Sequence, residues 1–354
     1  MNMEKTLMKG NEAIGEAAIR AGCRFFFGYP ITPQNELPEY MSRRLLEVDG
    51  TFIQAESEVS AINMVYGAAG AGARVMTSSS SPGISLKQEG ISYIAGAEVP
   101  CVIANIVRGG PGLGSIQPAQ SDYFQSTKAG GHGDYFVITY APASVQELVD
   151  LTMDAFEVAD KYRNPAMIFG DGILGQMMEP VELSKDPVEQ LPEKEWATTG
   201  MGDRTSSNII NSLALQAEKL EDHNLKLKEK YDQIQANETR YEILHEDAEY
   251  FVVAYGTTSR ACKNAINQLR EKGYNIGLIR PISIWPFPFE AFEKVAGNAK
   301  EYITVEMNLG QMVEDVKLAV NGAAPVKFYG RTGGVVPTPS EIAKEIERLL
   351  GGDQ

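Results

Sequence analysis

Residues 56–83 read ESEVSAINMVYGAAGAGARVMTSSSSPG, and this stretch decides the fold. Its first part, residues 56–73, has helical spacing and is rich in alanine and glycine, so the backbone of the predicted helix can pack very closely on its neighbours. Residues 74–81 indicate a short strand that runs into a serine-rich loop. A helix followed by an apolar strand and a polar loop is the repeating unit of an α/β protein.

The same alternation continues on both sides of this stretch, from about residue 10 to residue 180. Helices are predicted at residues 11–22, 84–99 and 143–162, and strands at 23–29, 100–108 and 164–171. Continuously apolar strands that alternate with helices indicate a parallel sheet covered on both faces.

Between about residues 181 and 245 the pattern changes. A polar, proline-spaced segment comes first, and then Leu213, Leu220, Leu227, Ile234 and Tyr241 recur every seven residues. This spacing predicts one amphipathic helix within residues 205–245. The helix either lies along its own domain or forms a coiled coil with a partner, and the pattern leaves both open.

A second α/β unit begins at Tyr250. Strands are predicted at residues 250–260, 276–288, 301–310 and 326–334, and a capped helix at residues 339–350. We therefore predict a first domain at 1–184, a linker with a long amphipathic helix at 185–245, and a second domain at 246–354. The predicted fold class is α/β, with two doubly wound, mostly parallel sheets joined by a long helical linker.

The composition excludes several classes of function. Lys and Arg number 32 and Asp and Glu 47, so the net charge is −15. This argues against nucleic acid as a partner, because phosphate binding needs clustered cations, and weakly against direct docking of an acidic electron carrier. Because the sequence has neither a long uncharged apolar stretch nor the apolar region of a signal peptide, we expect a cytoplasmic protein without a membrane span.

Metal and nicotinamide chemistry are not expected in this chain. Cys23, Cys101 and Cys262 lie far apart and are one short of the four thiolates that usually hold an iron–sulfur cluster. The three histidines show no metal-ligand spacing. The glycine-rich loop at residues 109–114 does not open a helix as a dinucleotide-binding fingerprint does. If the protein takes part in redox chemistry, we expect another chain to carry the electrons.

Three loops leave the carboxyl ends of predicted strands, at residues 28–36, 77–83 and 108–122. Ligands of doubly wound sheets bind beyond this edge. All three loops hold small polar residues and glycines rather than long charged side chains. We therefore expect a pocket for a neutral polar ring and a small anionic substrate.

Thr32 lies in the first of these loops, between two prolines. Pro30 and Pro33 restrict the backbone on both sides of it. A stiff loop can hold the Thr32 hydroxyl in place without the entropic cost of ordering it. The alternative is an ordinary strand-to-helix turn in which Thr32 caps the next helix.

Glu58 and Arg108 are the charged candidates. By helical period Glu58 lies close to the face of Ala61 and Ile62, and a half-buried carboxylate there needs a partner, which makes Glu58 a candidate proton-handling group. The alternative is the ordinary role of a carboxylate at a helix N-terminus, which Glu56 fits well. Arg108 ends a buried strand, where a guanidinium can bind a carboxylate through two hydrogen bonds; a surface ion pair is the competing interpretation.

These motifs together resemble a known family. The stretches GYPITPQNE, AESEVSAINMVYGAAGAGARVMTSSSSPG and EVPCVIANIVRGGPG are similar to the alpha-type subunit of the 2-oxoacid:ferredoxin oxidoreductases. GLIRPISIWPFP and VEMNLGQM resemble the second domain of the same subunit, and the resemblance is weakest at residues 185–245. Within the family, ESEVSAINMVYGAA, SSSSPGISLKQEGISY and DGILGQMMEPVE are most similar to the branched-chain type.

The resemblance implies a thiamine diphosphate enzyme. Residues 1–184 would be its pyrimidine-binding domain, and residues 246–354 a domain like the C-terminal domain of transketolase. Glu58 would hydrogen-bond the aminopyrimidine ring, and Thr32 and Arg108 would meet the carboxylate and keto end of the substrate. Further candidates for cofactor binding are Pro30, Ile31, Ser79 and Ser80.

The resemblance also implies partners and a reaction. A beta-type subunit would hold the diphosphate with its Mg²⁺ and carry an iron–sulfur cluster. A ferredoxin-like delta-type subunit would pass electrons outward, and a gamma-type subunit would complete the complex. The reaction would be oxidative decarboxylation of 3-methyl-2-oxobutanoate with coenzyme A, giving acyl-CoA, CO2 and reduced ferredoxin.

Two alternatives stay open. The same type of subunit can act on 2-oxoglutarate, pyruvate or an aryl pyruvate; the sequence shows no extra Lys or Arg near the three loops to hold a second carboxylate, which disfavours 2-oxoglutarate. The other alternative is a non-catalytic assembly subunit whose long helix recruits partners.

Overall fold

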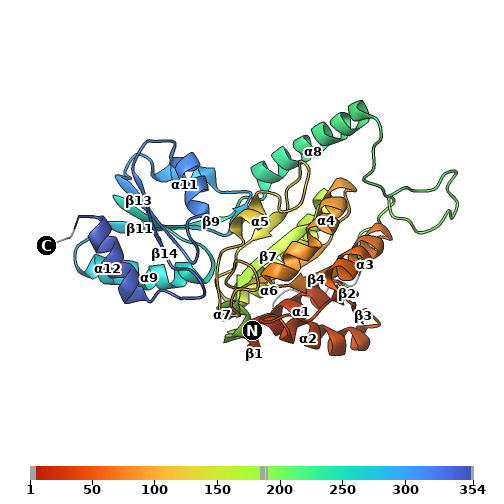
Figure 1. Cartoon of the computed structure of the whole chain (residues 1–354), viewed down its shortest axis with the longest axis horizontal. Helices are drawn as coiled ribbons and strands as arrows, with labels where there is room; N and C mark the ends of the chain where they lie inside the picture. The colour runs from red at the N-terminus through yellow and green to blue at the C-terminus, as the bar shows by residue number, and fades with distance from the viewer. Residues whose placement is uncertain (1–4, 184–187, 189, 352–354) are drawn as a thin grey trace.

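The computed structural model describes residues 5–183, 188 and 190–351, and two α/β lobes form most of it (Figure 1). Both lobes have mostly parallel sheets with helices on the two faces, so the predicted fold class is confirmed. The predicted boundary between residues 184 and 185 lies outside the described residues. Within the described residues, no helix is long and apolar enough to span a bilayer.

The first lobe is built on a seven-stranded sheet in the order β12-β6-β7-β5-β4-β2-β3. All neighbouring strands are parallel except β12, which pairs antiparallel with β6. The strands are β2 (Phe25–Gly28), β3 (Thr51–Gln54), β4 (Val75–Ser79), β5 (Val102–Val107), β6 (Ile138–Tyr140), β7 (Ala166–Asp171) and β12 (Ser283–Trp285). A separate antiparallel pair joins β1 (Thr6–Lys9) to β8 (Met178–Val181).

Helices cover both faces of this sheet. The elements are α1 (Gly10–Arg20), α2 (Glu36–Arg44), a 3-10 turn (Leu45–Val48), α3 (Glu58–Gly70), α4 (Ser81–Gly96), α5 (Tyr123–Thr127), α6 (Val145–Tyr162) and α7 (Gly172–Gln176). Helix α1 packs on α6 on one face, and α3 packs on α4 on the other (Figure 1). The small residues allow close packing, because a Cβ at Gly90 of α4 would lie 2.5 Å from Cγ2 of Ile62 in α3.

The second lobe has a five-stranded sheet in the order β14-β13-β10-β11-β9, in which only β9 is antiparallel to its neighbour. Its elements are β9 (Tyr241–Leu244), β10 (Tyr250–Val253), β11 (Ile276–Pro281), β13 (Glu301–Glu306), β14 (Val326–Gly330), α9 (Gly256–Glu271), α10 (Phe289–Val295), α11 (Met312–Val320) and α12 (Pro339–Leu349). The sequence predicted a capped helix at residues 339–350, and Thr338 caps α12 through a capping box with Glu341.

The strand predicted at residues 276–288 divides between the two sheets. Its first part is β11 in the second lobe, and its last part is β12, which extends the sheet of the first lobe beside β6. Pro281, at the end of β11, has no N–H to continue a ladder, and the chain turns after it. An apolar run shows that a strand is buried but not which sheet it joins, so this crossing was not predicted.

Helix α8 (Ala217–Asn237) joins the lobes and is shorter than the heptad pattern predicted. Leu213 precedes it, because the Asn211 side chain accepts a hydrogen bond from the Leu213 N–H (2.9 Å) and competes with helix formation there. Tyr241 lies in β9. Leu227 and Ile234 are buried, so α8 lies along its own chain, one of the two alternatives for this helix.

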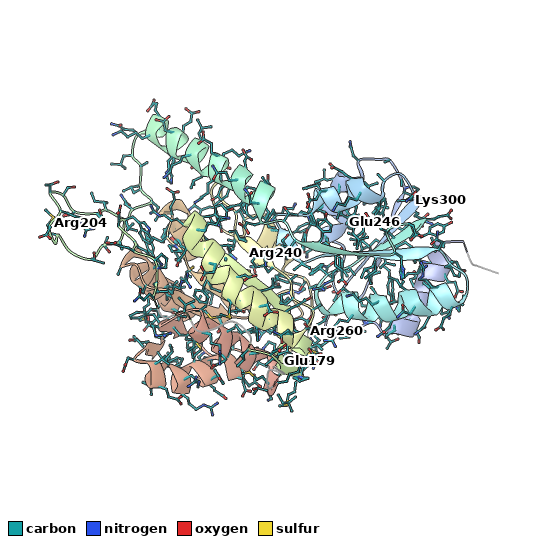
Figure 2. The ribbon with its side chains drawn as sticks, turned by 180° about the vertical axis from the view of Figure 1, so that it is seen from behind. Glu179, Arg204, Arg240, Glu246, Arg260 and Lys300 are labelled. Carbon is teal, nitrogen blue, oxygen red and sulfur yellow. The ribbon has the colours of Figure 1, made fainter. Side chains whose placement is uncertain are left out.

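Ion pairs and rings connect the two lobes. Arg260 of α9 pairs with Glu179 of β8 (2.8 Å), and Arg240 pairs with Asp154 of α6 (2.7 Å); Figure 2 shows both arginines at the junction. Tyr231 of α8 makes edge contacts with Phe136 and with Trp285 of β12. Together, these ion pairs and ring contacts pack the first-lobe sheet, the linker helix and the second lobe against one another.

Candidate active site

The candidate site lies at the carboxyl edge of the first sheet, where α3 and α4 begin. Ser57 caps α3 by accepting a hydrogen bond from the Ser60 N–H (3.2 Å), which places Glu58 in the first turn. The Glu58 side chain turns toward α4 and is only 7% exposed. Among the described residues its carboxylate has no hydrogen-bond partner. A buried carboxylate without a protein donor is costly, so it is suited to a ligand that donates a hydrogen bond.

Gly83 makes room for this carboxylate. A Cβ at that position would lie 2.7 Å from Oε1 of Glu58 and 2.1 Å from Oγ of Ser79. Any larger residue would displace both polar groups, so the glycine is required by close approach rather than by its backbone angles. Glu58 and Ser79, which are 21 positions apart in the sequence, therefore meet over the first turn of α4.

Ser79 and Ser80 are fully buried, and among the described residues their hydroxyl oxygens have no hydrogen-bond partner. Buried hydroxyls are nearly always bonded in folded proteins. The Ser79 hydroxyl lies beside the Glu58 carboxylate over Gly83, and these two groups form a polar edge that matches a ligand with donors and acceptors. An aminopyrimidine ring has both, so these residues fit the thiamine cofactor that the sequence resemblance implied.

The loop that carries Thr32 is held rigidly by side chains around it. The Pro33 carbonyl accepts hydrogen bonds from Asn11 (2.9 Å) and Gln176 (3.1 Å), and Ser78 donates to the Oε1 of Gln34. The first helical turn after the loop has Asn35 as its cap residue, so Thr32 does not cap that helix. Within the described part of the chain the Thr32 hydroxyl has no hydrogen-bond partner.

Arg108, at the start of the third predicted loop, is hydrogen-bonded to both of the other two. Its Nη1 donates to the Thr32 carbonyl (3.0 Å), and its Nη2 donates to the Leu113 carbonyl (3.1 Å). Its backbone N–H donates to the Ser81 hydroxyl (3.0 Å), which ties it to the start of α4. The side chain is buried, and its Nε has no partner among the described residues. Among the described residues Arg108 forms no ion pair, the alternative considered for it, and its Nε–H is free to bond a ligand.

Pro30 and Ile31 lie less deeply than the other candidates. Pro30 is exposed and Ile31 half-buried. Pro30 lines a cavity of about 240 Å³ together with Gly28 and Asn35, on the side of the loop toward β3. The structure therefore brings Glu58 and Ser79 together, with Ser80 next to Ser79 in the chain, links Thr32 to Arg108, and leaves Pro30 and Ile31 at the rim.

Sequence reasoning did not single out three residues that shape this site. Gly83 receives Glu58, Gln34 anchors the Thr32 loop, and Lys87 is a fully buried lysine one turn further along α4. A signal for Lys87 exists in the sequence, because Gly83, Lys87 and Gly90 have the spacing of one helical face. A lysine on a face otherwise made of glycine and apolar residues needs a buried partner.

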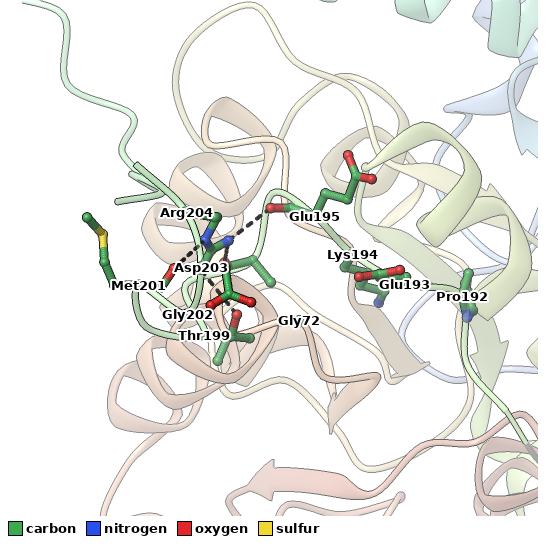
Figure 3. Close-up of a pocket in the computed structure, with 12 residues that line it drawn as sticks. Gly72, Pro192, Glu193, Lys194, Glu195, Thr199, Met201, Gly202, Asp203 and Arg204 are labelled. Carbon is green, nitrogen blue, oxygen red and sulfur yellow. Dashed lines mark hydrogen bonds between the residues drawn. The ribbon is translucent and has the colours of Figure 1, made fainter. Parts of the chain in front are cut away.

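A larger cavity lies at the other end of α3. It has a volume of about 740 Å³ and is lined by Gly72 and by residues 192–204 (Figure 3). It adjoins the C-terminal end of α3, about 20 Å along that helix from Glu58. Arg204 donates to carbonyls of its own loop, and the lining carries three carboxylates. An anionic substrate or cofactor is therefore poorly matched to this cavity.

Metal-ligating side chains do not cluster in the described part of the chain, where no three His, Cys, Asp or Glu residues are placed to hold an ion. All three cysteines are buried and unpaired. Burial raises the pKa of the Cys101 thiol to about 12, so it stays protonated near neutral pH.

Comparison with known proteins identifies the family. A family model described as the thiamine diphosphate-binding region of pyruvate flavodoxin/ferredoxin oxidoreductase matches residues 16–244, and one described as core domain II of pyruvate:ferredoxin oxidoreductase matches residues 248–342. The chain belongs to the 2-oxoacid:ferredoxin oxidoreductase family. It is an oxidoreductase subunit of the thiamine diphosphate-dependent type, in agreement with the sequence resemblance.

Relatives in this family are named as subunits. The ketoisovalerate oxidoreductase subunit VorB of Methanothermobacter marburgensis is 49% identical over 350 residues, which cover 99% of each chain. The 2-oxoglutarate synthase subunit KorA of Methanocaldococcus jannaschii is 37% identical over 366 residues, which cover 97% of this chain and 100% of that one.

Solved structures confirm the fold. A 2-oxoglutarate:ferredoxin oxidoreductase from Magnetococcus marinus superposes with a TM-score of 0.86 over 98% of this chain at 24% identity. This chain spans 65% of the length of that one. A split-gene transketolase superposes with a TM-score of 0.62 at 13% identity, covering 97% of this chain and 98% of the other. At these identities the likeness is one of fold alone.

Proposed function

We propose that this chain is the alpha-type subunit of a 2-oxoacid:ferredoxin oxidoreductase that acts on a branched-chain 2-oxoacid, 3-methyl-2-oxobutanoate. The reaction would consume coenzyme A and yield acyl-CoA, CO2 and reduced ferredoxin. The observation that carries the proposal is the Glu58 carboxylate, which is buried over Gly83 and receives no hydrogen bond from the residues that the structure describes. Thiamine diphosphate, when bound, supplies the carbanion chemistry that releases CO2 from a 2-oxoacid.

Each residue of the site has a role in this proposal. Glu58 holds the proton on the ring nitrogen of the aminopyrimidine that faces it, which is general acid–base work. Ser79 and Ser80 offer hydroxyls to the ring edge, with Pro30 and Ile31 at its rim. Thr32 and Arg108 orient the carboxylate and keto end of the substrate, because a positioned hydroxyl and free guanidinium N–H groups both suit these oxygens. The loop anchors described above keep this geometry rigid.

The proposal places only half of the cofactor site on this chain. The described residues show no metal-ligating cluster to accompany a diphosphate. A beta-type subunit would hold the diphosphate and its Mg²⁺ and carry an iron–sulfur cluster, with gamma-type and ferredoxin-like delta-type subunits completing the complex. We expect the isolated chain to bind thiamine diphosphate poorly. Tight binding to this chain alone in calorimetry would contradict a shared site.

The branched-chain substrate is favoured by the 49% identity to a subunit named for ketoisovalerate, against 37% to one named for 2-oxoglutarate. The site adds a physical reason, since Lys87 is fully buried beneath Glu58 and Arg108 is the cation of the loop edge. The three loops themselves, residues 28–36, 77–83 and 108–122, hold no Lys or Arg besides Arg108 for a second substrate carboxylate. Assay of the purified complex with several 2-oxoacids, coenzyme A and a viologen dye would settle the choice; faster turnover of 2-oxoglutarate would overturn it.

Glu58→Gln tests the central claim. In the assembled complex we expect decarboxylation to fall by about 100-fold or more, the scale of a lost general acid–base group. Assembly, which gel filtration measures, should survive, because glutamine has nearly the same size and shape as glutamate. Glu56→Gln is the matched control: Glu56 is exposed two residues earlier and accepts a bond from Ser60 (3.2 Å), so its variant should keep full activity. Full activity of Glu58→Gln would contradict the catalytic role of Glu58 and favour the alternative that this chain is a non-catalytic assembly subunit.

Arg108→Ala tests the substrate edge. We expect the substrate KM to rise by about 10-fold or more, because a charge-assisted contact is lost. A parallel calorimetric titration with the cofactor should show an unchanged Kd. An unchanged KM would restrict Arg108 to holding the two loops together.

A further inference from the structure

Lys87 is a charged group that the proposed reaction does not use. It lies in α4 four residues after Gly83, on the helix face that packs against α3, and its side chain is 0% exposed. Gly83 lies against the Glu58 carboxylate, and Gly90 on the same face lies against Ile62. The Lys87 side chain therefore starts one helical turn deeper than the carboxylate and is enclosed between α3, α4 and the sheet.

The ammonium group of Lys87 has one hydrogen-bond partner within the described residues. Its Nζ donates to the Oγ1 of Thr77 in β4 (2.8 Å), and the Thr77 hydroxyl donates its own proton to the Phe27 carbonyl (2.6 Å). Thr77 thus presents a lone pair to Lys87 and is held in that orientation by β2. A buried ammonium with a single neutral acceptor is under-compensated, so it needs a nearby negative charge.

Two titratable groups face Lys87 from the elements packed against it. Glu58 comes from α3, and Cys101 from the start of β5. Cys101 keeps its proton near neutral pH, because burial raises its pKa to about 12. Glu58 therefore supplies the negative charge that favours the Lys87 ammonium, and Lys87 supplies the countercharge for a carboxylate that has no donor of its own.

We propose that Lys87 is a positioning residue for Glu58: its buried ammonium attracts the carboxylate from beneath, and so keeps the Glu58 side chain aimed at the mouth of the site. The catalytic part of this inference rests on the proposed function of Glu58, whereas the pairing of the two charges does not. The arrangement leaves the outer side of the carboxylate free for a ligand donor, because Lys87 approaches from the side of the sheet.

Burial opposes the charge on Lys87 and lowers its pKa to about 8, against the attraction of Glu58. The pairing is therefore expected to fail just above neutral pH, when the ammonium loses its proton. A positioning role then predicts a pH dependence near 8 in any property that depends on Glu58, whereas a merely structural lysine predicts none.

The first experiment follows the Lys87 proton directly. The full chain is labelled with ¹³Cε-lysine, and the one lysine signal that is missing from Lys87→Met is titrated between pH 6 and 11. We expect its midpoint near 8, well apart from the surface lysines, and a further downward shift of about one pH unit or more in Glu58→Gln. A midpoint that Glu58→Gln does not move would overturn the pairing.

The second experiment measures the consequence in the assembled complex. We expect Lys87→Met to weaken thiamine diphosphate binding about 10-fold in calorimetry at pH 7 and to remove the pH dependence near 8 from both binding and kcat/KM. Unchanged cofactor affinity and an unchanged pH profile would overturn the positioning role. Should Glu58→Gln keep full activity while the lysine titration still shifts, the proposed function would fail and the charge pair would stand, so the two claims are separable.

Discussion

Each lobe has a buried glutamate at the carboxyl edge of its sheet, and the two are treated in opposite ways. Glu306 ends β13 and is 0% exposed; its carboxylate accepts hydrogen bonds from Asn308 Nδ2 (2.9 Å) and from the N–H groups of Met312 (2.9 Å) and Val313 (3.0 Å). It caps the start of α11. Glu58 is 7% exposed at the start of α3 and receives no hydrogen bond from the described residues.

The comparison separates a structural carboxylate from one that is open to a ligand. Both side chains are buried and both are close to a helix N-terminus, so neither burial nor the helix dipole distinguishes them. The difference lies in the donors: those around Glu306 belong to the chain itself, whereas Glu58 receives none from the described residues, and we propose that a ligand provides one. The neighbouring hydroxyls repeat the contrast, because Ser79 is unpaired whereas Thr258 donates to Gln120 Oε1 (2.9 Å) between the lobes.

Replacing each glutamate by glutamine gives the largest expected difference. Glu306→Gln puts an NH2 group where backbone N–H groups already point, so we expect a loss of about 3 kcal/mol in the free energy of unfolding. Glu58→Gln disturbs no donor, and the loss of its attraction moves the release of the Lys87 proton down by about one pH unit, which limits the loss of stability to about 1 kcal/mol at pH 7. Urea denaturation of the two variants measures both, and equal losses would erase the distinction.

Lys87→Met sharpens the comparison through pH. In the wild-type chain, burial lowers the pKa of Lys87 from 10.5 to about 8. Between these two pH values the unfolded chain binds more protons than the folded chain, so the stability of the wild type rises as the pH increases from 8 to 10.5. Below pH 8 the charge costs roughly 3 kcal/mol. Lys87→Met removes this cost but also loses the hydrogen bond to Thr77. We therefore expect the variant to be about 2 kcal/mol more stable than wild type at pH 7 and no more stable at pH 10.5.

Denaturation curves at the two pH values provide the check. Leu86→Met, an exposed change next to Lys87 on the same helix, serves as the control and should leave stability unchanged at both. A Lys87→Met variant that is less stable than wild type at pH 7 would contradict the buried-charge account.

The smallest effect compares two hydroxyls. Ser79→Ala removes an unpaired buried hydroxyl, so we expect no loss of stability or a gain of about 0.5 kcal/mol. Thr258→Val removes a paired one and should lower stability by about 1 kcal/mol. Thermal unfolding resolves this difference. A clear loss in Ser79→Ala would mean that the chain itself satisfies the hydroxyl, and the site would then lose one of its open polar groups.

Much of the fold could be predicted from residue order. The helix at α3, the buried strands β5 and β7, and the capping box of α12 are local patterns of period and caps, and the structure contains all of them. The elements that were missed have weak local signals. The short strand β3 is mostly exposed, and β12 shares its apolar run with β11, so their places depend on which strands they meet.

The site was predicted in part for the same reason. Glu58 and Arg108 stand out because each is a charge at the end of an apolar element. The helix predicted at residues 205–245 was too long, since a seven-residue repeat does not register the Asn211 side chain that interrupts it. Gly83 and Gln34 carry no local mark of their function, because what they contact lies 25 and 44 positions away.

The sequence by itself determined the α/β class, the family and the three loops that meet at the carboxyl edge, because strand order, small-residue helices and stiff turns are written in local spacing. Only the tertiary structure decided that the Glu58 carboxylate lies over Gly83 without a hydrogen-bond donor among the described residues, while Glu306 accepts several hydrogen bonds, and that Lys87 is buried one helical turn below Gly83. Hydrogen bonds and charge pairs depend on distances of a few ångströms between residues far apart in the chain, and only packing fixes those distances.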